Sequence, residues 1–211
     1  MVPKGAIQKN VLGLKSIPSR SSSNHNRTVL SNSAVSHTVL QNYSGSFVAV
    51  DFETADYGRD SACSVALVRV EGNTIVDKAY SLIRPPRRGF LFTYLHGISW
   101  KHVSKKPTFG ELWPQLATYL EDAEFLVAHN ASFDRSVLKA CCLAAGLNLP
   151  KLSFRCTVRL ARQIWRIHPT KLPNVCAYLG IPLKHHDAMS DAEACAKIVI
   201  AARQQVEYDK H

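Results

Sequence analysis

The chain has 211 residues, 46% of them hydrophobic, which is enough for one globular domain with a buried core. Its 26 Lys and Arg outnumber the 16 Asp and Glu and give a formal net charge of +10, a surplus that favours polyanionic partners. The composition excludes collagen-like, mucin-like and wholly disordered chains, and the sequence has no apolar run long enough for a membrane span or a secretory signal.

Residues 1–45 are rich in Ser and Asn and carry five Lys or Arg but no acid. This composition predicts a disordered tail. The tail could be an inert extension, a basic arm that holds nucleic acid, or a cleaved organellar transit peptide. We expect the folded domain at residues 46–204, a short C-terminal tail at residues 205–211, and a cytoplasmic location unless the first segment directs the protein to an organelle.

Three strands are predicted after the tail. Phe47–Phe52 and Ala62–Val70 are near-continuous apolar runs of strand length, and the turn residues 71–73 separate the second run from Thr74–Ile83. Because the turn is short, the second and third strands should form an antiparallel hairpin. A long basic and aromatic loop is expected at residues 84–107.

Helices and strands alternate in the rest of the chain. Thr108 and Glu111 have the spacing of a capping box, and apolar residues at helical spacing follow as far as Leu120. The later predictions are a strand at Glu124–Ala128, a helix at Ser132–Ala145, a short strand at Leu152–Arg155, and helices at Thr157–His168, Leu172–Leu179 and Ala188–Arg203. This order indicates a mixed α/β fold.

The six cysteines include no CxxC pair, and several lie within apolar patterns. This usage predicts reduced thiols in a reducing compartment, and the spacings do not suit a zinc site.

Acidic side chains stand where apolar ones are expected. Asp51 and Glu53 end the first strand on one face, because side chains alternate along a strand. Asp191 shares a helical stripe with Cys195 and Ile198, so its charge must be paired, bound to a metal or neutralised. Asp134 lies in the first turn of a predicted helix, where interaction with the helix N-terminus would also explain it.

If these four carboxylates meet, they need cations, since each close pair repels by roughly 4 kcal/mol at an effective dielectric near 20. Oxygen ligands from Asp and Glu select Mg2+ or Mn2+ over zinc. Two such ions about 4 Å apart are the arrangement used for in-line displacement at phosphate.

Three segments resemble the exonuclease motifs of the DnaQ-like, DEDDh-type 3′-5′ exonuclease family: Asp51-Phe52-Glu53-Thr54, His129-Asn130-Ala131-Ser132-Phe133-Asp134, and His186-Asp187-Ala188-Met189-Ser190-Asp191. The resemblance covers about residues 47–203 and implies a ribonuclease H-like fold, a mixed five-stranded sheet flanked by helices with its third strand antiparallel.

Carried over by the resemblance, the four acids Asp51, Glu53, Asp134 and Asp191 would bind two Mg2+ or Mn2+ ions. His186 would be the general base, a role that suits a near-neutral pKa; only its spacing to Asp191 favours it over the adjacent His185. The residues expected to contact the terminal nucleotide are Thr54, His96, His129, Asn130 and Phe133. Arg155, Arg159, Arg162 and Arg166 could follow a phosphate backbone or form a solvated helix face.

The implied reaction removes nucleoside 5′-monophosphates from the 3′ end of nucleic acid, with single-stranded DNA as the expected substrate. An RNA-trimming enzyme and a non-catalytic nucleic-acid-binding or polymerase-accessory module are the alternatives. Residues 55–57, Ala-Asp-Tyr, depart from the Thr-Gly that members of the family often have soon after the first Glu. The expected partner is nucleic acid with a free 3′ end and not a membrane; a homodimer is left open. The chain ends soon after the last predicted helix without a polymerase-tethering extension, which favours an independent nuclease.

Overall fold

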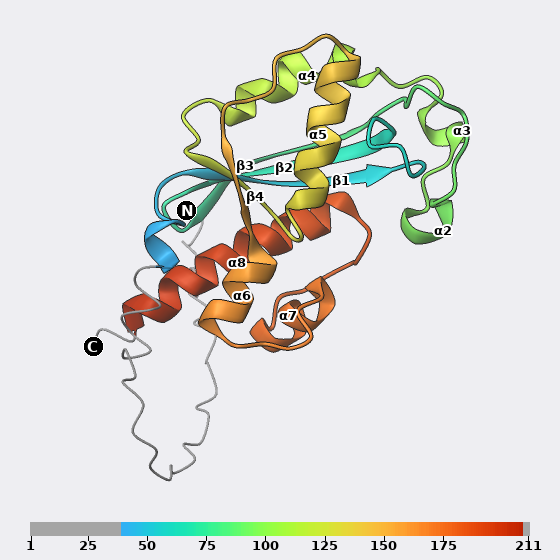
Figure 1. Ribbon diagram of the computed structural model, residues 1–211. Coiled ribbons are helices and arrows are strands. Elements are labelled where there is room, and N and C mark those ends of the chain that lie inside the picture. The colour runs from blue at the N-terminus through green and yellow to red at the C-terminus, as the bar shows by residue number, and fades with distance from the viewer. Residues whose placement is uncertain (1–38, 209–211) are drawn as a thin grey trace, which may run out of the picture.

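The computed structural model describes residues 39–208 (Figure 1). Apolar runs with strand periodicity build one five-stranded sheet in the order β3-β2-β1-β4-β5. The strands are β1 Phe47–Thr54, β2 Ala62–Glu71, β3 Thr74–Leu82, β4 Phe125–Ala128 and β5 Ser153–Cys156. β1 to β3 pair antiparallel, and β4 and β5 continue the sheet parallel to β1, which confirms the expected mixed, ribonuclease H-like sheet.

Helices cover both faces of this sheet (Figure 1). They are α2 Thr93–His96, α3 Trp100–Val103, α4 Phe109–Ala117 with the 3-10 turn η1 Thr118–Leu120, α5 Ser132–Ala144, α6 Thr157–Ile164, α7 Leu172–Leu179 and α8 Ala188–Tyr208. α4 and α5 lie over one face, and α6, α7 and α8 lie over the other. None of the helices in residues 39–208 has both the length and the apolar character needed to cross a membrane.

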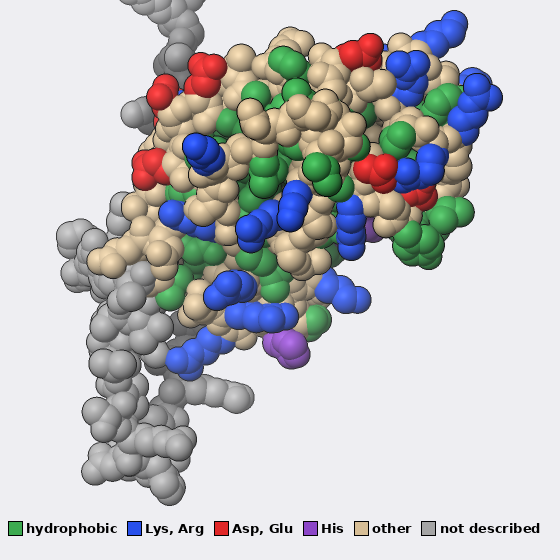
Figure 2. Space-filling view, turned by 45° about the horizontal axis from the view of Figure 1, so that its top comes forward, with side chains coloured by type: hydrophobic (Ala, Val, Ile, Leu, Met, Phe, Trp, Pro, Cys, Tyr) green, Lys and Arg blue, Asp and Glu red, His purple; other side chains and the backbone are tan. Residues whose placement is uncertain are grey.

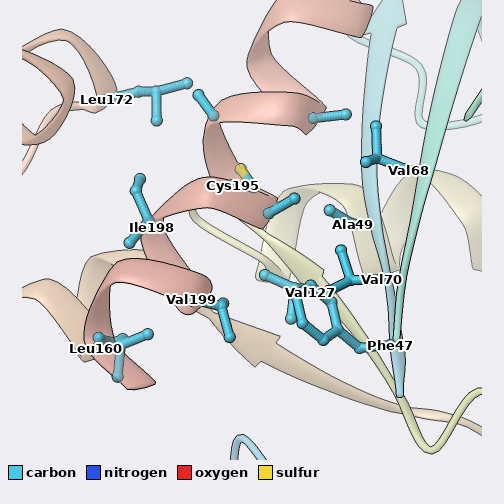
Figure 3. Packing of buried hydrophobic residues seen from close by; sticks show 14 of the residues in the cluster. Phe47, Ala49, Val68, Val70, Val127, Leu160, Leu172, Cys195, Ile198 and Val199 are labelled. Atoms are coloured by element: carbon cyan, nitrogen blue, oxygen red, sulfur yellow. The ribbon is translucent and has the colours of Figure 1, made fainter. Parts of the chain in front are cut away.

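The alternation of side chains along β1 divides the core into two layers. Phe47 and Ala49 pack with α8, whereas Val48 and Val50 pack with α4 and α5. Figure 3 shows Cys195 of α8 close to Ala49 and Val68 of the sheet. Because these side chains are fully buried, the first turn of α8 is held over the end of β1.

The structure differs from the sequence prediction in two connecting segments. The expected loop of residues 84–107 contains the one-turn helices α2 and α3. α6 ends at Ile164 instead of His168, because Arg166 has a left-handed φ of 54° and His168 precedes Pro169.

The predicted tail lies outside the described residues as far as residue 38 and stays a prediction there. Residues 39–45 are described, and Tyr43 is only 6% exposed. Its ring meets Phe125 edge-on with centroids 6.1 Å apart, and its hydroxyl donates to the carbonyl of Cys156 at 3.0 Å. The packed part of the chain therefore begins earlier than the predicted boundary at residue 46. An isolated Tyr after a polar segment has no periodic pattern that would have revealed this.

Candidate active site

Asp51 and Glu53 project from the end of β1 toward α8, on the same face as Phe47 and Ala49. Oxygen atoms of Asp51, Glu53 and Asp191 all lie within 4.8 Å of one another. β1 reaches this point unaccompanied on one side, because its pairing with β4 covers only residues 47–49. The edge of β1 that carries the acids is thus open to side chains from other elements.

Asp134 fills this open edge. It is 2% exposed in the first turn of α5, and its Oδ1 accepts the backbone N–H of Phe52 at 3.1 Å. That N–H has no partner on β4, and a buried unpaired backbone donor would be destabilising. The hydrogen bond therefore fixes Asp134 directly beside Asp51 and Glu53.

Asp191 reaches the same point from the first turn of α8. Asp187 caps this helix, since its Oδ1 accepts the N–H of Ser190 at 3.2 Å. Oδ2 of Asp191 accepts the backbone N–H of His186 at 3.1 Å and lies 3.0 Å from Nδ1 of His185. Its other oxygen, Oδ1, is buried without a hydrogen-bond partner among the described residues. A buried carboxylate oxygen without a protein partner, aimed into a cluster of acids, fits a cation ligand.

Burial raises the pKa of all four carboxyl groups, and repulsion from neighbouring acids adds to this for Asp51, Glu53 and Asp134. Burial is the largest cause for each, and it raises the pKa of Glu53 from 4.5 to about 8 and that of Asp134 from 3.8 to about 7. The pKa of Asp51 lies well above its ordinary value because burial is joined by repulsion from Asp134, Asp191 and Glu53. The pKa of Asp191 is also raised by burial, against the hydrogen bond from His186. A divalent cation would stabilise the ionised form of these buried carboxyl groups, which solvent does not reach.

His185 and His186 have different environments although their rings are stacked with centroids 3.9 Å apart. His185 is engaged through Nδ1, which can donate its proton to Asp191. The ring nitrogens of His186 have no hydrogen-bond partner within the described residues, and burial lowers the pKa of this imidazole. His186 has a left-handed φ of 66°, a strained conformation for a residue with a side chain. Of the two rings, only that of His186 thus has both nitrogens without a hydrogen-bond partner within the described residues.

A cavity of about 380 Å3 opens beside these groups. Its walls come from the end of β1 with Glu53, from β2 and β3, from α2 with His96, and from the loop that carries His186. The volume lies in the range of small-ligand sites.

Two residues expected to contact a nucleotide, His129 and His96, form hydrogen bonds within the protein. His129 is half-buried between Thr157 and Thr170: Nδ1 lies 2.8 Å from the Thr157 hydroxyl and Nε2 lies 2.9 Å from the Thr170 carbonyl. In His96, Nδ1 accepts the N–H of Ile98 at 3.0 Å and Nε2 lies 3.2 Å from the carbonyl of Thr54. Both nitrogens of each ring are therefore occupied, although His96 still lines the cavity.

The other three expected contacts lie beside the acids. Thr54 is 5% exposed and follows Glu53 at the end of β1. Asn130 is exposed and has a left-handed φ of 65°. Phe133 is half-buried, and the guanidinium of Arg59 lies 4.6 Å from its ring centroid. Of these, Asn130 and Phe133 retain surface that another molecule could contact.

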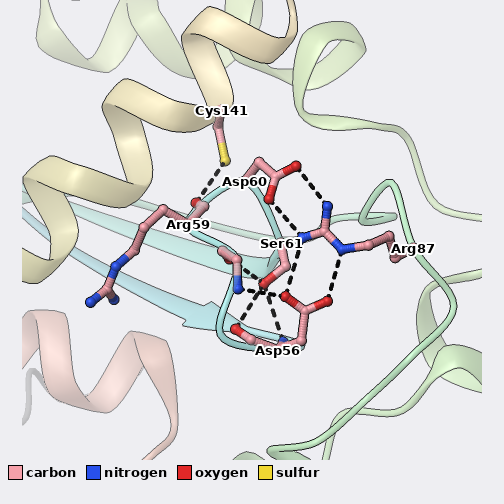
Figure 4. Close-up of polar contacts among 7 residues, drawn as sticks. Asp56, Arg59, Asp60, Ser61, Arg87 and Cys141 are labelled. Atoms are coloured by element: carbon pink, nitrogen blue, oxygen red, sulfur yellow. Dashed lines mark hydrogen bonds and ion pairs between the residues drawn. The ribbon is translucent and has the colours of Figure 1, made fainter.

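The loop after β1 is held by Arg87, which the sequence did not indicate. The Arg87 guanidinium donates to both carboxylates of Asp56 and Asp60 at distances of 2.6 to 3.1 Å (Figure 4). A Cβ at Gly58 would lie 2.2 Å from the guanidinium, so a larger residue there would displace the end of the Arg87 side chain. The residues that depart from the Thr-Gly pattern thus form a loop fixed by ion pairs.

The predicted arginine stripe does not exist as one surface. Arg155 lies half-buried on β5 with its guanidinium 3.5 Å from the ring centroid of Phe125, whereas Arg159, Arg162 and Arg166 are exposed. A spacing of three or four residues predicted one face, but Arg155 lies on β5 and Arg166 follows the end of α6 at Ile164.

The carboxylates of Asp51, Glu53 and Asp191 converge at the end of the central strand of a ribonuclease H-like sheet, with Asp134 held beside them. A family model described as Exonuclease matches residues 48–199, and the chain belongs to this exonuclease family.

Curated relatives include the PolC-type DNA polymerase III of Thermotoga maritima, 31% identical over 159 residues that make up 73% of this chain but 12% of the polymerase. The exodeoxyribonuclease 10 of Escherichia coli is 30% identical over 72% of this chain and 66% of its own length.

Solved structures have the same fold. An exonuclease X in complex with 5′ overhanging duplex DNA matches with a TM-score of 0.61 and 25% identity, over 75% of this chain and 91% of that one. The nuclease domain of 3′hExo, a DEDDh family member bound to rAMP, has a TM-score of 0.66 at 17% identity, over 77% and 93% of the two chains.

The sequence missed two groups that build the site. His185 contacts Asp191, and Asp187 caps α8. The spacing from Asp187 to Ser190 is that of a helix N-cap and was a usable signal. Nothing in the sequence indicated the contact of His185.

Proposed function

We propose that this chain is a metal-dependent 3′-5′ exonuclease that hydrolyses the terminal phosphodiester of DNA, preferably single-stranded, and releases nucleoside 5′-monophosphates. The observation that carries the proposal is the meeting of Asp51, Glu53, Asp134 and Asp191 at one point beside an unengaged imidazole. These four residues would hold a pair of Mg2+ or Mn2+ ions. Bound divalent ions would lower the pKa of a water and offset negative charge on the phosphate.

The residues of the chain supply positioning and proton transfer. Asp134 and Asp191 are locked by backbone hydrogen bonds from Phe52 and His186, so the carboxylates keep their places when a substrate arrives. His186 accepts the proton of the attacking water, because its lowered pKa keeps the ring neutral near pH 7. His185 holds Asp191 from the other side and acts as a positioning residue.

The terminal nucleotide would occupy the cavity between β1, α2 and the His186 loop. Phe133 offers a ring that a base could stack on, and Asn130 offers an exposed amide. His96 lines the cavity and is held by the carbonyl of Thr54, whereas His129 contacts Thr157 and Thr170. We therefore assign His129 to support of the site instead of substrate contact.

Matched 5′-labelled DNA and RNA oligomers test the proposal. We expect a ladder of shortened products with Mg2+ or Mn2+ and none with EDTA, and faster digestion of single-stranded DNA than of RNA. Intact oligomers under every metal condition would refute the enzymatic function. Faster digestion of RNA would favour the RNA-trimming alternative, since the cation site does not read the 2′-hydroxyl.

Variants of the two neighbouring histidines separate their roles. His186→Ala should lower turnover by roughly two to four orders of magnitude, the usual contribution of a general base, with metal binding retained. His185→Ala should weaken metal binding through loss of the Asp191 contact, so that added Mn2+ restores much of the turnover. The opposite pattern would transfer the proton-accepting role to His185.

A further inference from the structure

All Lys, Arg, Asp and Glu residues in one long segment of the chain are basic. Residues 135–186 contain no Asp or Glu and nine Lys or Arg: Arg135, Lys139, Lys151, Arg155, Arg159, Arg162, Arg166, Lys171 and Lys184. The other 159 residues hold 17 basic and 16 acidic side chains. Almost the entire net charge of the protein therefore comes from this quarter of the chain.

The fold brings this segment to one side of the molecule. α5 and α6 lie over opposite faces of the sheet, and β5, the edge strand, runs between them. Figure 2 shows Lys and Arg side chains gathered over the middle and lower part of this face, with the acidic side chains toward its sides. Apart from Lys184, the solvent-exposed members of the segment lie on α5, in the loop before β5, on α6 and in the loop after it; they are Arg135, Lys139, Lys151, Arg159, Arg162, Arg166 and Lys171. We call these seven residues the basic face.

Two other members of the segment are engaged with residues outside it. Arg155 stacks on Phe125, and Lys184 pairs with Asp187 at 3.1 Å. By contrast, Lys139, Lys151 and Arg159 form no ion pair within residues 39–208. Because these three cations have no acidic partner there, the face is electrostatically suited to a polyanion.

The basic face is connected to the candidate active site by direct contacts. Arg162 Nε donates to the hydroxyl of Thr170 at 2.8 Å, and the carbonyl of Thr170 lies 2.9 Å from Nε2 of His129. His129 begins the segment that carries Asp134. These contacts join Arg162 to that segment, and Arg135 directly follows Asp134 on α5, so the face adjoins the candidate active site.

We propose that the basic face binds the phosphate backbone of the nucleic-acid substrate upstream of its 3′-terminal nucleotide. The proposal rests on the exonuclease function proposed above and adds a second binding region to it. Contacts of this kind recognise charge and not base sequence, so the face would increase affinity for long substrates without changing the hydrolysis step. A dinucleotide would not reach it.

The test is the triple variant Lys139→Gln, Lys151→Gln, Arg159→Gln. All three side chains are exposed, so the fold should be retained. Lys101→Gln, Lys105→Gln, Lys106→Gln, on and after α3, is the matched control with the same loss of charge from exposed positions. A third variant with Lys139→Arg, Lys151→Arg and Arg159→Lys preserves the charges. Binding of a 5′-labelled DNA oligomer of about twenty nucleotides is measured in EDTA, and hydrolysis of the same oligomer and of a dinucleotide is measured with Mn2+.

We expect the slope of log affinity against log salt to become less steep by about 2 in the Gln variant, since each phosphate contact to a single strand contributes roughly 0.7. KM for the long oligomer should rise at least tenfold, whereas kcat for the dinucleotide stays unchanged. The control and the charge-preserving variant should behave like the wild-type protein.

Equal salt slopes in the Gln variant and the control would overturn the proposal. The proposal would also be overturned if the Gln variant lost binding to anionic lipid vesicles but kept its affinity for the oligonucleotide. Because binding is measured in EDTA, the outcome does not depend on catalysis. A protein that binds through this face but hydrolyses nothing would refute the exonuclease function alone.

Discussion

Replacing Asp134 by Asn should stabilise the metal-free protein and remove its response to divalent cations. Asp134 is 2% exposed, and its pKa is raised from 3.8 to about 7, with burial as the largest cause. The native state therefore holds the proton more tightly than the unfolded chain does. The resulting stability is complete below about pH 4 and is lost as the pH rises to about 7.

The size of this effect follows from the shift. Three pKa units correspond to about 4 kcal/mol, which is the stability that the ionised Asp134 forfeits near pH 8. Asn carries no charge at any pH, and its amide oxygen can still accept the N–H of Phe52. For a chain of this size the gain corresponds to a rise in Tm on the order of 10 °C.

Thermal unfolding at about pH 5 and about pH 8, with EDTA or with Mg2+, measures the prediction. In EDTA the advantage of the variant should be large at the higher pH and small at the lower one. At a hundred times its Kd, Mg2+ should stabilise the wild-type protein by about 2.7 kcal/mol and so raise its Tm. The Tm of the variant should stay unchanged. Asp77→Asn on the exposed strand β3 is the control. A variant no more stable than wild type in EDTA at about pH 8 would refute the reasoning.

Three further changes test other parts of the structure. His129→Gln should flatten the loss of stability on acidification, because burial lowers the pKa of His129 to about 4 and the unfolded chain takes up a proton below about 6.5; equal urea midpoints against pH in both proteins would contradict this. Phe125→Ala should lower the unfolding free energy by about 3–5 kcal/mol, since the ring is fully buried and stacked on Phe47 with ring centroids 5.3 Å apart. Urea denaturation measures this loss, and a smaller loss would contradict the prediction. Arg87→Ala should lower the Tm slightly, with less than about 1 kcal/mol for each exposed pair, and the difference should shrink in high salt; a difference independent of salt would point to lost packing instead.

Periodicity in the sequence was sufficient for the strands and for the acids that the strands carry. Alternation placed Asp51 and Glu53 on one face of β1, and helical spacing placed Asp191 on the buried stripe of α8; both placements are confirmed. The partner of Asp134 could not be predicted in the same way. Its contact with Phe52 exists because β4 has only four residues and leaves the end of β1 open, which is a property of two distant segments.

Sequence patterns could not predict the hydrogen bonds of the histidine rings either. His96, His129 and His186 all lie in polar or mixed segments, and one could not have ranked them by exposure. The structure distinguishes them by their hydrogen bonds: both nitrogens of the first two are occupied, whereas the ring of His186 is unengaged among the described residues. Long-range partners such as Thr170 decide the matter, and their positions depend on the whole fold.

The two helix-borne acids share a local device that explains why their motifs look alike. Asn130 and His186 each adopt a left-handed φ, of 65° and 66°, shortly before the helix that carries the acid. α5 and α8 each begin two residues later and carry Asp134 and Asp191 in their first turns. Asn tolerates this conformation readily, but His does so at a cost. The backbone N–H of His186 then donates to Asp191, so the strained residue both orients the carboxylate and carries the imidazole next to it. Fixed spacing in these motifs therefore encodes a backbone geometry, and a change in the number of residues between His186 and Asp191 would separate the imidazole from the acids.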